Sequence, residues 1–175
     1  NNLPKYFIYG HEYVVDINFF EEAISYSVIG GDVYLLKIKS DGAEAIGLEM
    51  DEFYLSQEVE MFVYSLDRKM AIGSFNSRNN KIHNKFSTSL VKGDEIVIEI
   101  FIPFNVVNDS YIQISKIIHD FTDLLKFNES FQNDRNSCNT NVACSEAEQF
   151  EDQINSVVLM TMGGGTRSAS LINNV

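Results

Sequence analysis

Three histidines, His11, His83 and His119, are the side chains best suited to proton transfer near neutral pH. In a serine hydrolase such an imidazole activates a nearby hydroxyl group, and an acid and an oxyanion hole complete the site. None of the three accompanies a nucleophile motif, and Ser168 and Ser170 lack the glycine-flanked turn that exposes a nucleophilic serine. We therefore assign no catalytic residue to this chain, and we expect His119 to lie at the end of a strand.

The two cysteines of the chain, Cys138 and Cys144, leave two chemistries open. Thiolates bind zinc, but a structural zinc site normally has four ligands, and no histidine lies near these two in the sequence. In a secreted protein they would instead be disulfide partners, of each other or of cysteines elsewhere. We predict no metal site and treat both residues as disulfide candidates.

A run of three glycines at 163–165 is a further candidate, because glycine-rich loops can cradle phosphate groups. Such a loop needs a helix N-terminus, commonly with Lys followed by Ser or Thr, whereas the residues after this run have the pattern of a strand. The acidic residues include no calcium-binding loop motif. We predict a hairpin turn at the glycines and no cofactor.

Composition excludes several classes of partner. The net charge is −12, from 25 acidic and 13 basic residues, and such a surface repels nucleic-acid phosphates and anionic lipids. No run of 18 apolar residues occurs, so no membrane span is predicted. The chain begins at Asn1 without a methionine or a leader, which favours a processed or excised protein whose export signal lies upstream.

The first 125 residues have the pattern of short strands separated by turns. In residues 95–103, Ile96, Ile98, Ile100 and Ile102 would line one face of a strand, and Pro103 would end it. Further alternating runs cover 33–39, 45–50, 60–64 and 71–75. Residues 111–125 fit either a helix or a strand that ends near His119 before a turn or short helix, and we favour the strand. This spacing predicts an all-β, antiparallel β-sandwich.

The composition changes at residue 126. Residues 126–153 are rich in Asn, Ser, Gln and acidic residues, which is typical of a linker, and they include both cysteines. Residues 154–175 then contain an apolar run, the three glycines and a second run, which together predict a β-hairpin. We therefore divide the chain into a sandwich domain (1–125), a polar linker (126–153) and a hairpin (154–175).

Four segments near the end of the chain succeed one another in a recognisable order: 138–144 (CNTNVAC), 153–159 (QINSVVL), 164–166 (GGT) and 170–174 (SLINN). Together they resemble the start of the catalytic domain in secreted lysyl-endopeptidase-like serine proteases of trypsin-like fold. Upstream, 32–43 (DVYLLKIKSDGA), 62–64 (FVY), 73–76 (GSFN) and 93–99 (GDEIVIE) resemble the strands that precede that domain. The resemblance implies that 154–175 is the opening hairpin of a trypsin-like barrel.

The chain departs from the family pattern at several positions. Tyr34 replaces a tryptophan and Ser145 replaces a proline. Arg167 and Ser168 occupy the neighbourhood of a cysteine that, in the family, pairs with one beside the catalytic histidine. The segments T-A-H-C and G-D-S-G-G do not occur, so the resemblance carries no catalytic residue onto this chain.

The resemblance implies a non-catalytic N-terminal or pro-domain portion of a secreted trypsin-like endopeptidase, which assists its folding or restrains its activity. Its partner would be the missing protease domain or another protein chain, and its location secreted, periplasmic or at the cell surface. Lys126 and Arg135, in the polar linker, are candidate maturation cleavage sites. The alternative is a stand-alone or degenerate protease-like β-sandwich that serves as a binding or structural module at the cell surface. A third possibility is a sandwich that binds carbohydrate, in which exposed Tyr or Phe side chains would stack on sugars.

Overall fold

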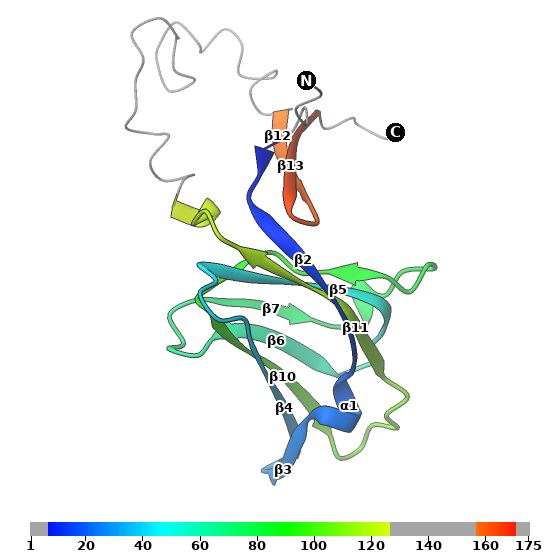
Figure 1. Ribbon diagram of the computed structural model, residues 1–175. Helices are drawn as coiled ribbons and strands as arrows, with labels where there is room; N and C mark the ends of the chain where they lie inside the picture. The colour runs from blue at the N-terminus through cyan, green and yellow to red at the C-terminus, as the bar shows by residue number, and fades with distance from the viewer. Residues whose placement is uncertain (1–6, 127–156, 171–175) are drawn as a thin grey trace, which may run out of the picture.

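The computed structural model describes residues 7–126 and 157–170, and most of this part is an antiparallel β-sandwich (Figure 1). One sheet has the strand order β3-β4-β10-β6-β7, with bounds Ile24–Val28, Gly31–Lys39, Glu95–Pro103, Glu60–Ser65 and Ala71–Phe75. The other has the order β2-β11-β5-β8, with β9 also paired to β5, and bounds Gly10–Asn18, Tyr111–Asp120, Ala45–Tyr54, Phe86–Ser87 and Val91–Lys92. The predicted all-β fold is confirmed.

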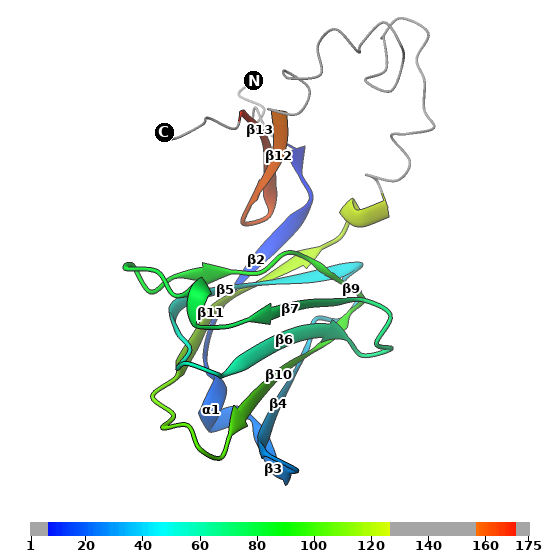
Figure 2. The same cartoon turned by 180° about the vertical axis from the view of Figure 1, so that it is seen from behind.

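Outside the two large sheets lie a short helix, a 3₁₀ turn and a third, three-stranded sheet. Helix α1 spans Phe19–Glu22 and the 3₁₀ turn spans Ser77–Asn79. The third sheet has the order β1-β13-β12, with bounds Phe7–Ile8, Gly165–Ser170 and Val157–Met162. Figures 1 and 2 show this sheet at one end of the sandwich, next to the start of β2, with β3 at the opposite end.

The core lies between the two large sheets and follows the alternation of each strand. In β10, Ile96, Ile98 and Ile100 are completely buried. They belong to one apolar cluster with buried residues of β5 and β11, among them Ile46, Leu48, Met50, Ile112 and Ile114. Burying one such side chain contributes about 1.5–3 kcal/mol to the stability of the fold. Strand β10 is also paired on both sides, with β4 and with β6. The predicted inward face of this strand is confirmed.

Strand β11 ends at Asp120, one residue after His119, as the alternation predicts. The Asp120 side chain is buried where the strand ends. Asp120 is completely buried, and it accepts hydrogen bonds from the backbone N–H groups of Thr122 and Leu124, both at 2.8 Å, and from the Thr122 hydroxyl at 3.0 Å. Residues 124–126 then begin a helical turn. Asp120 therefore fixes the direction in which the chain leaves the sandwich toward the linker.

Helix α1 and strand β3 are features that the strand pattern did not predict. Asn18 caps α1, because its side chain accepts a hydrogen bond from the N–H group of Phe20 at 3.1 Å. The helix inserts Phe19, completely buried, into the core. The chain then turns into β3, which pairs antiparallel with β4.

Candidate functional site

The most informative contact in the structure joins the β12–β13 hairpin to the N-terminal end of the sandwich. The predicted hairpin is confirmed, since β12 pairs antiparallel with β13 from Val157–Ser170 to Met162–Gly165. Strand β1 adds to the other edge of β13, with Phe7 opposite Thr166 and Ile8 opposite Gly165. Strand β1, which leads into the sandwich, is thus the third strand of the sheet that contains the hairpin.

The turn of the hairpin continues this contact beyond β1. The carbonyl oxygen of Gly164 accepts hydrogen bonds from the backbone N–H groups of Tyr9 and Gly10, at 2.8 and 3.0 Å. The Tyr9 hydroxyl donates to the carbonyl oxygen of Gly163. A Cβ atom at Gly164 would overlap the carbonyl oxygen of Gly10, so the close approach requires glycine at this position. The glycine run is a turn that fits against the sandwich, and not a phosphate loop.

A lysine between two carboxylates lies beside this turn. Lys116 on β11 forms ion pairs with Glu12 on β2, at 2.6 Å, and with Glu49 on β5, at 3.1 Å. Neighbouring strands bring the three side chains together, because Lys116 lies opposite Val14 in β2 and opposite Glu49 in β5. The ion pairs link three neighbouring strands of this sheet, the edge strand β2 with β11 and β5, beside the turn of the hairpin.

These contacts shift the pKa values of the groups involved. The hydrogen bond from Lys116 is the main cause that lowers the pKa of Glu12, and a backbone hydrogen bond from Gly164 contributes in the same direction. The hydrogen bonds to Glu12 and Glu49 raise the pKa of Lys116. Burial, with smaller contributions from the charges of Asp120, Glu49 and Glu12, raises the pKa of Tyr9 to about 12. At neutral pH the Tyr9 hydroxyl is therefore protonated and available as a donor to the turn.

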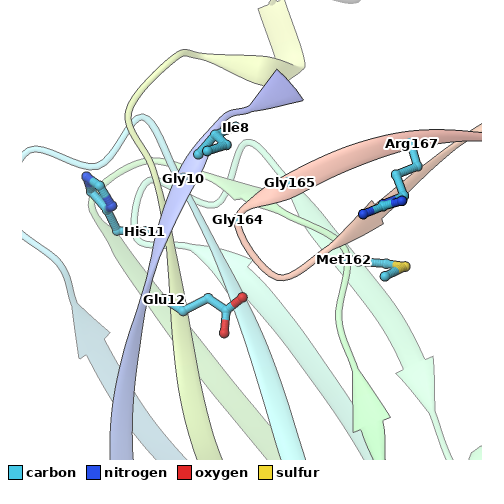
Figure 3. A pocket seen from close by; sticks show the side chains of 8 residues that line it. All are labelled: Ile8, Gly10, His11, Glu12, Met162, Gly164, Gly165 and Arg167. Atoms are coloured by element: carbon cyan, nitrogen blue, oxygen red, sulfur yellow. The ribbon is translucent and has the colours of Figure 1, made fainter. Parts of the chain in front are cut away.

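Two hollows flank the turn. The first has a volume of about 400 Å³ and is lined by residues of β1, β2 and the hairpin: Ile8, Gly10, His11, Glu12, Met162, Gly164, Gly165 and Arg167. Figure 3 shows the Glu12 and Arg167 side chains reaching toward the space between β2 and the hairpin, whereas His11 points away from it. The second, of about 220 Å³, lies on the side of β5 and includes Tyr9, Glu49 and Thr88. The turn of the hairpin therefore contacts the sandwich, and one hollow lies on each side of this contact.

The histidines do not meet at this junction. The ring of His11 lies against Phe121, with centroids 4.8 Å apart, and Nδ1 of His83 accepts a hydrogen bond from the N–H group of Lys85. His119 is at the end of its strand, as predicted, but its Nδ1 lies 2.7 Å from the hydroxyl oxygen of Ser40. The sequence could not reveal this pair, because 79 positions separate the two residues.

The Ser40–His119 pair does not have the surroundings of a catalytic serine. Within residues 7–126 and 157–170, no carboxylate is hydrogen-bonded to His119, and the ring instead meets Tyr13 edge-on at 5.8 Å. The backbone N–H group of Ser40 already donates to the carbonyl oxygen of Asp94. An activated serine needs an acid that orients the histidine and N–H donors that stabilise an oxyanion. The acid is missing among the described residues, and the N–H group of Ser40 itself is already used.

Some of the other candidate residues lie within the described ranges and some lie outside them. Lys126 lies at the end of the first described segment, with its side chain 71% exposed and 3.9 Å from a carboxylate oxygen of Asp123. Arg135, Cys138 and Cys144 lie outside the described residues. Ser168 and Ser170 lie on β13 and are exposed.

The described residues also bear on metal binding and on membrane insertion. No cluster of three or more His, Cys, Asp or Glu side chains suited to a metal ion occurs in the part of the chain that the structure describes. In that same part, no helix has the length and apolar character needed to cross a bilayer.

Comparison with known proteins adds no assignment to these observations. No protein-family model matches the chain, and the search of solved structures gives no significant match. The junction must therefore be interpreted from its own geometry. Its backbone pairing, glycine contact and ion pairs are suited to holding one β element on another, and they bring no nucleophile, base and acid together.

Proposed function

We propose that this chain is the non-catalytic N-terminal, pro-domain portion of a secreted trypsin-like serine endopeptidase. One observation carries the proposal. The hairpin that resembles the opening of the protease domain forms its sheet with β1, a strand that leads directly into the sandwich. A leader domain that assists or restrains a protease needs such a direct contact with the protease fold.

The contact supports a role in folding. A two-stranded hairpin is at best marginally stable in water, and three strands or packing on a further surface are needed for stability. Here β1 supplies the third strand, and the Tyr9 and Gly10 amides hold the turn. The sandwich has its own buried core. It would therefore fold first and present a ready edge to the hairpin.

The same contact supports restraint. While β1 occupies the edge of β13, no other strand of a protease domain can pair there. Cleavage at Lys126 or Arg135 would cut the covalent link between the sandwich and the hairpin. The Lys126 side chain is exposed, so a protease could reach it. The hydrogen bonds of the junction would still hold the two parts together after the cut, so activation would require their separation as well.

A cleavage experiment tests this proposal. A chain with a site-specific protease sequence in place of residues 127–133 would be cut and then passed through a gel-filtration column under native conditions. We expect the two pieces to elute together, because β1 and β13 remain paired, and to separate in urea. Elution of the C-terminal piece apart from the sandwich without denaturant would contradict the proposal. The same chain left uncut is the control.

A second candidate function is a protease-like binding module without a catalytic partner. Arg167 and Ser168 favour it, because both are exposed on β13. In the proteases that this segment resembles, a cysteine that forms a disulfide lies in that neighbourhood. In that case the junction would hold the hairpin permanently as part of the module. The two candidates differ in whether the native protein continues past Val175 into a catalytic domain.

A further inference from the structure

The edges of the two large sheets differ in how well they are protected against pairing with another chain. Exposed edge strands can pair with other strands, and proteins block this with charges, prolines, bulges or very short strands. On the second sheet, β8 and β9 have only two residues each, and β2 carries Glu12 and Asp16. On the first sheet, the pairing of β7 is interrupted by a register shift between Met61 and Val63 of its partner strand.

Strand β3, the remaining edge, has none of these protections. Its five residues, Ile-Ser-Tyr-Ser-Val, include no charge and no proline, and its pairing with β4 runs without interruption from Ile24–Leu35 to Val28–Gly31. All five residues are exposed. Ile24, Tyr26 and Val28 are 69%, 49% and 37% exposed. An apolar, regular and open edge of this kind favours association with a further strand.

The sequence of β3 is self-complementary in an antiparallel arrangement. A twofold axis at Tyr26 would place Ile24 opposite Val28 of a second copy, Ser25 opposite Ser27, and Tyr26 opposite itself. Every cross-strand pair would then join two apolar or two hydroxyl side chains, which are favourable pairs on a sheet surface. This symmetry matches the isologous interface of a twofold dimer.

The surroundings of β3 also favour a second copy as the partner. The three apolar side chains lie opposite Leu35, Val33 and Gly31 of β4, so the apolar strip continues onto the sheet. A net charge of −12 opposes contact between two copies over most of the surface, and β3 offers a stretch without charge. In Figures 1 and 2, β3 lies at the end of the sandwich away from the hairpin, so both contacts can form at once.

We propose that β3 pairs antiparallel with β3 of a second copy of this chain about a twofold axis at Tyr26, which joins the two five-stranded sheets into one continuous sheet. The proposal is independent of the protease-related role, because it involves neither the hairpin nor the linker.

Sedimentation equilibrium of the full chain over a range of concentrations tests the proposal. We expect a monomer–dimer equilibrium that becomes tighter as salt screens the net charge. Tyr26→Lys is expected to weaken the dimer at least about tenfold, because the twofold axis places the two lysines face to face. Tyr13→Lys is the matched control, since Tyr13 is also on an edge strand and is 50% exposed, and it is expected to leave the dimer unchanged.

Hydrogen–deuterium exchange of residues 24–28 separates a loss of pairing from a loss of folding. In the unmodified chain, the exchange of this segment should slow as the concentration rises, while the core strand β10 stays unchanged. A chain that remains monomeric at all accessible concentrations would overturn the proposal. A dimer that survives Tyr26→Lys, or that Tyr13→Lys weakens equally, would overturn it as well.

Discussion

Gly164→Ala is expected to detach the β12–β13 hairpin from the sandwich and to leave the sandwich folded. The added Cβ would overlap the carbonyl oxygen of Gly10, and backbone hydrogen bonds hold both segments at this point. Forcing a methyl group into such a contact costs about 1–3 kcal/mol. The backbone amides of β1 and β13 should therefore exchange with solvent about 10- to 100-fold faster.

Hydrogen–deuterium exchange with mass spectrometry measures this effect, and Gly42→Ala is the control. Gly42 has a positive φ of 78°, and a Cβ there would meet no atom within 4 Å. The control change should therefore lower the stability of the sandwich by about 1 kcal/mol and leave the hairpin amides unaffected. Equal exchange rates of the hairpin amides in Gly164→Ala and in the unmodified chain would show that the turn does not pack against Gly10.

Asp120→Ala is expected to lower the free energy of unfolding of the sandwich by about 3 kcal/mol. The carboxylate is completely buried and accepts the N–H groups of Thr122 and Leu124, and the change would leave both donors without an acceptor. Because Asp120 also fixes the exit of β11, residues 121–126 should become more accessible to proteases. Urea unfolding followed by circular dichroism gives the free energy directly.

Asp41→Ala is the matched control for the buried carboxylate. Asp41 is an exposed aspartate whose contact with Lys39, at 2.7 Å, is a surface ion pair. Surface pairs contribute little, so the control should change the free energy of unfolding by less than about 0.5 kcal/mol. A loss of similar size in both variants would mean that the Asp120 hydrogen bonds do not stabilise the fold as described.

The elements that could be predicted from the sequence are those with a local signal. Alternation of isoleucines marks β10, and the glycines at 163–165 mark the hairpin turn, because period-two patterning and turn chemistry act over a few residues. Strand β3 carries the same kind of signal in a weaker form. Its alternation of apolar residues and serines is as regular as that of β10, but it is only five residues long, so it does not stand out from the surrounding sequence.

The junction could not be predicted, because its contacts are distant in sequence. Tyr9 and Gly163 are 154 positions apart, and Lys116 is 104 positions from Glu12. Strand β1 has only two residues, too few to show alternation. Such contacts arise from the way the sheets assemble, and no local pattern of residues encodes them.

We propose that this chain is the front part of a trypsin-like protease, and that its sandwich helps the protease to fold or restrains it. Intact mass measurement and non-reduced peptide mapping of the protein purified from its native source test this claim most directly. We predict peptides beyond Val175 that contain the catalytic histidine and Gly-Asp-Ser-Gly-Gly segments, with cleavage after Lys126 or Arg135 in the mature form. A native protein that ends near Val175 and copurifies with no such segment would contradict the claim and leave a stand-alone β module.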